Sequence, residues 1–148
     1  CGRFASALKP SDAWLELMQE WSDALFNRYN VSPASQIGAF VEGRCHAMRW
    51  GLVPSWAKNL SGASRLINAR AETVATKPSF RAAFKRRRCL ILADGFYEWQ
   101  KSPGTTKKQP FLIHRADARP FLLAGLHETW MDEHGKDQVW PVIEAMAR

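Results

Sequence analysis

The chain has 148 residues, of which 46% are hydrophobic, and this is enough for one domain with a buried core. Its formal net charge of +7 favours an acidic partner, with nucleic acid the first candidate and an acidic membrane surface the second. No apolar run of about 18 residues and no signal-peptide core are present, so we expect no transmembrane helix, and three cysteines without CxxC spacing argue against a disulfide framework and a structural zinc site.

The first part of the chain predicts one helix followed by a hairpin. Residues 11–26 carry apolar side chains at i, i+3 and i+4 spacing, which predicts an amphipathic helix that Ser11 or Asp12 can cap. Two strand-like stretches, Gln36–Val41 and Arg44–Trp50, meet at Glu42-Gly43, which predicts a short hairpin. Loops are expected at Asn27–Pro33, at residues 51–56, where the chain turns and presents aromatic side chains, and at residues 59–64.

The second part of the chain predicts mainly strands. Asn68, Arg70 and Glu72 are two positions apart, so their side chains would share one face of an extended segment. Pro78 suits the first turn of a helix that ends near Lys85. Further strands are expected at Cys89–Ala93, Phe96–Gln100, Phe111–His114, Phe121–Leu126 and Val139–Ile143, with a turn at Asp94-Gly95 and a basic loop over Lys101–Lys108. Together these elements predict an α+β fold, one mostly β domain over residues 1–148 with two helices.

Six cations and no acid lie between Glu72 and Asp94. They are Lys77, Arg81, Lys85, Arg86, Arg87 and Arg88. Cations at a helix end complement the helix dipole, and the same cations can bind phosphate, so two compatible interpretations stay open. The chain also has seven tryptophans, and aromatic residues interleaved with cations are typical of surfaces that bind single-stranded nucleic acid.

Cys1, once it carries a free α-amine, would have a chemistry that no internal cysteine has. Its amine can add to an aldehyde to give a Schiff base, and its thiol can then close onto the same carbon to give a thiazolidine. An α-amine has a pKa of about 7.7–8.0, so much of it is nucleophilic near neutral pH. Arg3 is a candidate cation for making the thiol more reactive, and Gly2 removes side-chain bulk where a ligand would approach.

Four segments stand out together in the sequence. They are Cys1-Gly2-Arg3-Phe4, residues 50–56 (WGLVPSW), residues 67–73 (INARAET) and residues 93–99 (ADGFYEW). In this order and spacing they resemble the SOS response-associated peptidase (SRAP) family, from Cys1 to about Trp130. The resemblance implies a single domain with curved, barrel-like sheets that senses abasic sites in single-stranded DNA. It also implies a thiazolidine crosslink between the N-terminal cysteine and the ring-opened deoxyribose, with possible abasic-site lyase chemistry. We therefore expect a cytoplasmic monomer that associates with the nucleoid when bound to DNA and needs no metal or cofactor.

The resemblance implies catalytic roles for Cys1, Asn68 and Glu98. Asn68 matches the family's active-site asparagine, which is expected to hydrogen-bond the sugar or the α-amine. Glu98 matches the family's catalytic glutamate, and a carboxylate can carry the protons that sugar opening and dehydration require. Arg70 matches an arginine expected to bind phosphate. The other residues expected at the DNA surface are Gly2, Arg3, Asn30, Pro33, Trp50, Trp56, Phe80, Arg81 and Trp99, although at least one of the tryptophans is expected to pack in the core.

The chain departs from the family pattern near its C-terminus. The family has a catalytic histidine in a His-Asp-Arg or His-Asn-Arg segment, and none of His46, His114, His127 and His134 lies in such a context. We therefore expect a form truncated at its C-terminus that reverses its crosslinks slowly. Two other functions stay open: an amidohydrolase in which the Cys1 thiol is the nucleophile and its own amine the base, and a non-catalytic single-strand-binding module that ignores the lesion.

Overall fold

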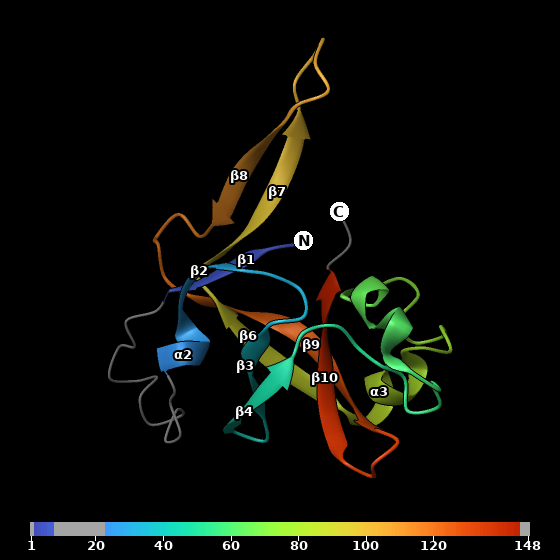
Figure 1. Cartoon of the computed structure of the whole chain (residues 1–148). Coiled ribbons are helices and arrows are strands. Elements are labelled where there is room, and N and C mark those ends of the chain that lie inside the picture. Colours follow the sequence, from blue (N-terminus) through green and yellow to red (C-terminus); the bar gives the residue numbers. More distant parts are fainter. Residues whose placement is uncertain (1, 8–22, 146–148) are drawn as a thin grey trace.

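The computed structural model describes residues 2–7 and 23–145, and strands are their main secondary structure, so the fold is mostly β as the sequence predicts (Figure 1). The strands are β1 (Phe4–Ala7), β2 (Asn27–Val31), β3 (Gln36–Val41), β4 (Arg44–Arg49), β5 (Asn68–Arg70), β6 (Arg88–Ala93), β7 (Gly95–Lys101), β8 (Lys108–His114), β9 (Phe121–Met131) and β10 (Asp137–Ala145). The helical elements are α2 (Asp23–Phe26), the 3-10 helix η2 (Leu60–Arg65) and α3 (Arg81–Arg86). None of the helices in this part of the chain is long and apolar enough to cross a membrane.

The strands form two sheets. The smaller sheet has the order β2-β1-β7-β8, and the larger has the order β4-β3-β6-β9-β10-β5. All neighbouring strands are antiparallel except β10 and β5, which are parallel. Because β10 also approaches β4, near the opposite edge of the larger sheet, that sheet is curled like part of a barrel. This curvature agrees with the expected barrel-like architecture.

Asp94 marks the point where the chain leaves the larger sheet at β6 and enters the smaller sheet at β7. Its backbone N–H donates to the Ala5 carbonyl (2.9 Å), and its carboxylate accepts the Ala7 N–H. Burial raises the pKa of the Asp94 carboxyl, while the hydrogen bond from Ala7 opposes that rise. The predicted turn at Asp94-Gly95 is therefore a junction that fixes β1 against both sheets.

The core lies where the two sheets face each other. The Phe4 ring of β1 meets the Trp50 ring edge-to-face, with centroids 5.3 Å apart, and Phe96 of β7 meets Phe121 of β9 in the same way at 6.4 Å. Phe4 and Trp50 are each 1% exposed. Burying an apolar side chain of this size stabilises the fold by about 1.5–3 kcal/mol, so these contacts hold β1 against the larger sheet.

The predicted hairpin at Glu42-Gly43 is confirmed, with β3 and β4 paired from Gln36–Arg49 to Val41–Arg44. Both turn residues have a positive φ, 50° and 79°. This is the backbone that a two-residue hairpin requires because it matches the twist of the flanking strands. The predicted strands that became β6, β7, β8, β9 and β10 are also confirmed.

Two loop predictions are wrong, and the helix expected to hold Pro78 in its first turn begins only at Arg81. Residues Asn27–Val31 form β2, which supplies β1 with a second hydrogen-bonding neighbour. Asn27, Tyr29 and Asn30 are exposed, Arg28 is half-buried and only Val31 is fully buried, so the polar sequence shows no sign of a strand. Residues 60–65 form η2, at whose start Asn59 accepts the Ser61 N–H. The predicted helix over residues 11–26 falls largely outside the described residues, which include only α2.

Candidate active site and nucleic-acid interface

One core cluster brings together the segments that carry the predicted catalytic residues. Phe4, Trp50, Ile67 and Phe96 all pack in this cluster, and the Trp50 indole N–H donates to the Ile67 carbonyl at 2.9 Å. Gly2 and Arg3 directly precede Phe4, Asn68 directly follows Ile67, and Glu98 lies two residues beyond Phe96. The N-terminal strand, β5 and β7 therefore converge at the same region. Cys1 itself lies outside the described residues.

The pairing of β1 with β7 decides which face of the smaller sheet each residue of β7 occupies. Phe4 lies opposite Phe96, so both share one face, and strand alternation puts Glu98 on that face as well. This face packs toward the larger sheet, and Glu98 is half-buried there. Trp99 lies on the opposite face and is 42% exposed. Glu98 thus faces the region of Trp50 and Asn68, whereas Trp99 faces away from it.

Arg3 and Asn30 form the polar contact nearest the N-terminus. The Arg3 guanidinium donates to the Asn30 side-chain oxygen at 3.1 Å, and the Arg3 carbonyl accepts the Tyr97 N–H at 2.9 Å. Pro33 lies in the turn after β2 and is half-buried. A methyl group added at Gly2 would meet no described atom within 4 Å. The two predicted residues Arg3 and Asn30 are therefore brought together, and space remains beside Gly2.

β5 presents Asn68 and Arg70 on one side, as the alternation predicts. Asn68 lies opposite Ile143 and Arg70 opposite Ala145 in the parallel pairing with β10. Ala69, between them, is buried in the core under α3, which fixes the strand. Asn68 is half-buried and Arg70 is exposed. Glu72 lies in the following turn rather than on the strand, so the predicted alignment of three polar side chains holds for two of them.

The predicted aromatic surface residues divide into exposed and buried sets. Trp56 is 68% exposed and Trp99 is 42% exposed, so both offer ring surface to a ligand. Trp50 and Phe80 are 1% and 2% exposed, and both belong to core clusters. Their assignment to the DNA surface is therefore wrong, because no ring face is left for a base. Tyr97, which is not among the predicted site residues, is half-buried on β7 two positions before Trp99, so strand alternation puts both rings on one face.

The basic segment around α3 lies at the end of β6 remote from β7 (Figure 1). Arg81, Lys85, Arg86 and Arg87 line a shallow depression there. Arg87 forms an ion pair with the buried Glu128 at 2.6 Å, so it has a structural role. Lys85 and Arg86 occupy the last turn of α3, where cations complement the helix dipole. Exposed Arg81 thus lies at the end of β6 opposite to β7 and β1, although Ala69 of β5 packs under α3.

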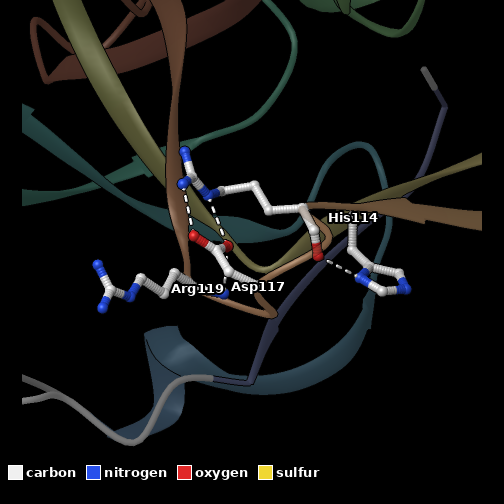
Figure 2. A network of polar contacts seen from close by, with 4 residues as sticks. His114, Asp117 and Arg119 are labelled. Atoms are coloured by element: carbon white, nitrogen blue, oxygen red, sulfur yellow. Dashed lines mark hydrogen bonds and ion pairs between the residues drawn. The ribbon is translucent and has the colours of Figure 1, made fainter.

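Two histidines have defined surroundings, and neither supplies a catalytic pair. His127 lies on β9, where burial and the nearby Arg87 cation lower its pKa. His114 ends β8 and approaches the Arg115 carbonyl, beside a bidentate Arg115–Asp117 pair at 2.9 and 2.6 Å (Figure 2). Asp117 also accepts the Arg119 N–H, so this network shapes the turn before β9. Within the described residues, no three His, Cys, Asp or Glu side chains could hold a metal ion.

The SRAP family model, described as SOS response associated peptidase, matches residues 1–146. This chain belongs to the SRAP family. It is 41% identical to the abasic site processing protein YoaM of Bacillus subtilis over an alignment of 111 positions, which covers 72% of this chain and 48% of YoaM. It is 32% identical to the abasic site processing protein YedK of Escherichia coli over an alignment of 158 positions, which covers 99% of this chain and 68% of YedK.

Solved structures show the same SRAP fold. A protein from Bacteroides thetaiotaomicron superposes with a TM-score of 0.86 over 99% of this chain and 68% of its own, at 24% identity. A protein from Bordetella bronchiseptica superposes with a TM-score of 0.79 over 100% of this chain and 73% of its own, at 22% identity. The chain spans about half the length of the Bacillus relatives it matches.

Proposed function

We propose that this SRAP protein recognises abasic sites in single-stranded DNA and captures them covalently through Cys1. The convergence of the N-terminal strand, β5 and β7 carries the proposal, because it brings Arg3 and Phe4, which closely follow Cys1, into the region of Asn68 and Glu98. The relatives matched over most of the chain are named abasic site processing proteins, which supports an abasic site as the substrate. The net charge of +7 favours a nucleic-acid partner.

The proposed reaction joins the Cys1 aminothiol to the aldehyde of the ring-opened deoxyribose. The amine attacks the aldehyde carbon to give a carbinolamine, which loses water to form a Schiff base. The Cys1 sulfur then adds to the imine carbon, and the nitrogen takes a proton to complete the thiazolidine. One aldehyde and one aminothiol thus give one thiazolidine and one water, so the step requires no oxidant, reductant or cofactor.

Glu98 and Asn68 are the proposed assistants of this reaction. A carboxylate can remove a proton from the attacking amine and return it to the departing hydroxyl, and such general acid–base help is worth about 10²–10⁴-fold in rate. The half-buried position of Glu98, facing the Trp50 side of the sheet, suits that role. Asn68 supplies an amide that can hydrogen-bond the sugar hydroxyl or the amine. Arg3, Asn30, Trp56 and Arg70 are the proposed DNA contacts at this end.

Electrophoresis under denaturing conditions tests the proposal against its two rivals. The protein is incubated with labelled single-stranded DNA that contains an abasic site, with undamaged DNA, and with a tetrahydrofuran analogue that lacks the aldehyde. The proposal predicts a heat-stable shifted band only with the true abasic site. Binding without any covalent band would instead favour a non-catalytic module, and turnover of amide substrates with no DNA adduct would favour an amidohydrolase.

A further inference from the structure

The β7–β8 hairpin projects from the body of the molecule, and β1 lies at its base (Figure 1). Residues directly opposite each other in an antiparallel pair share a face, and successive residues alternate between faces. Tyr97 pairs with Leu112, Trp99 with Pro110 and Lys101 with Lys108. These pairs occupy one face of the hairpin, whereas Glu98, Gln100 and Gln109 occupy the other.

We define the hairpin stripe as Tyr97, Trp99, Lys101 and Lys108. The Tyr97 and Trp99 rings are neighbours, with centroids 6.5 Å apart and planes inclined at 44°. The Tyr97 hydroxyl donates to the Tyr29 carbonyl of β2 at 2.8 Å, which holds its ring across β1. Lys101 and Lys108 are exposed and face each other across the two strands. Two rings followed by two cations therefore form a continuous row.

No acid interrupts the hairpin stripe. Between Asp94 and Asp117 the only acidic residue is Glu98, and it lies on the opposite face of β7. The stripe also begins beside the N-terminal strand, because the Tyr97 N–H donates to the carbonyl of Arg3. A ligand lying along the stripe would therefore meet the chain two residues from Cys1. The row of cations favours a polyanion over a second apolar protein surface.

We propose that Lys101 and Lys108 extend the DNA surface expected at Trp99 along the hairpin and bind phosphates of the single strand that flanks the abasic site. This inference rests on the proposed function. Bases would stack on Tyr97 and Trp99, and Lys101 and Lys108 would contact phosphates farther out. Stacking on aromatic rings combined with backbone cations is the general mode by which proteins hold single strands without reading their sequence. β7 rises about 3.4 Å per residue, so Tyr97 and Lys101 lie about 14 Å apart, room for about four stacked nucleotides at about 3.4 Å each.

Two variants with the same change in net charge distinguish DNA binding by the hairpin stripe from general electrostatic attraction. Lys101→Gln/Lys108→Gln removes two charges from the stripe, and Gln100→Glu/Gln109→Glu changes the net charge by the same amount at adjacent positions on the other face. Affinity is measured for undamaged oligothymidine of about 12 nucleotides, over a range of salt. Two lost phosphate contacts should lower the slope of log K against log salt by about 1.4 and weaken binding about tenfold or more near 0.1 M salt.

A third variant keeps the composition and moves the cations to the other face. Gln100→Lys/Lys101→Gln/Lys108→Gln/Gln109→Lys should bind as weakly as the neutralised stripe, although its net charge is that of the wild type. Equal losses of affinity in the first two variants would overturn the proposal that the hairpin stripe binds the strand. Wild-type affinity of the third variant would overturn it as well. The adduct test on the wild-type protein is independent of these affinities. If the wild type forms the adduct but the neutralised stripe variant binds DNA as tightly as the wild type, only this inference is overturned. If binding depends on the stripe but no adduct forms, only the proposed reaction is overturned.

Discussion

Glu98 and Trp99 are neighbours in the chain that face opposite sides of β7. Glu98 faces the core side, where Trp50 and Asn68 lie. Trp99 faces solvent on the hairpin. Their roles should therefore separate cleanly in variants, with chemistry on one side and strand binding on the other. Arg70 is a third case, since it is exposed on β5 beside the half-buried Asn68.

Glu98→Gln should slow adduct formation by about 10²–10⁴-fold, because an amide keeps the shape of the side chain and cannot carry a proton. Affinity for abasic and undamaged single strands should stay close to that of the wild type. Single-turnover crosslinking at saturating DNA measures the first quantity, and fluorescence anisotropy measures the second. A crosslinking rate within a factor of two of wild type would remove Glu98 from the reaction.

Arg70→Gln should weaken single-strand binding largely independently of base sequence, because phosphate contacts carry no sequence information. The salt slope should fall by about 0.7, the value for one phosphate contact on a single strand. Lys136→Gln is the matched control, since Lys136 is exposed in the β9–β10 turn and the charge change is the same. Identical slopes for the two variants would mean that Arg70 does not contact the strand.

At the scale of elements, α2 depends on one close approach to β3. A methyl group added at Gly38 would lie 2.2 Å from the Phe26 ring, and Phe26 is 1% exposed. Gly38→Ala should therefore lower the free energy of unfolding by about 1–3 kcal/mol, the usual cost of overpacking. Chemical denaturation measures this change. In a Phe26→Leu background the added cost should shrink, and an unchanged cost would show that the clash is not with this ring.

How much of the fold follows from the sequence depends on which faces of a strand are buried. The β3–β4 hairpin is predictable because alternating burial and the Glu42-Gly43 turn agree. β1 and β2 escape prediction, since β1 is short and β2 exposes polar side chains and forms an irregular pairing with it. The burial of Phe80 could not be predicted from the sequence either, because it depends on packing with residues distant in the chain, such as Leu126.

At the scale of the whole molecule, His127 couples stability to pH. Burial and Arg87, with a smaller contribution from His46, lower its pKa, while Glu128 opposes the shift. The unfolded chain, with a histidine pKa of about 6.5, therefore binds this proton more readily than the folded chain does. The stability that neutral His127 contributes is complete above that pH and is lost as the pH falls through about 6.5 toward the folded pKa.

Thermal denaturation between about pH 7.5 and about pH 5.5 measures this coupling around the unfolded pKa. His127→Gln should flatten the fall in Tm on acidification, and His134→Gln should leave it unchanged because His134 is exposed in the β9–β10 turn. The slope is compared rather than the absolute Tm, since the substitution can also change packing. Equal slopes in wild type and His127→Gln would assign the coupling to another group.

The central claim, capture of abasic DNA by the Cys1 aminothiol, is tested most directly by intact-mass measurement of the adduct with Cys1→Ser as the comparison. The wild-type protein should give a heat-stable species whose mass equals that of protein plus oligonucleotide minus one water. Cys1→Ser keeps an amine and loses the thiol, so it should give only a Schiff base that requires borohydride to survive heating. As much heat-stable adduct from Cys1→Ser as from the wild type would contradict the account.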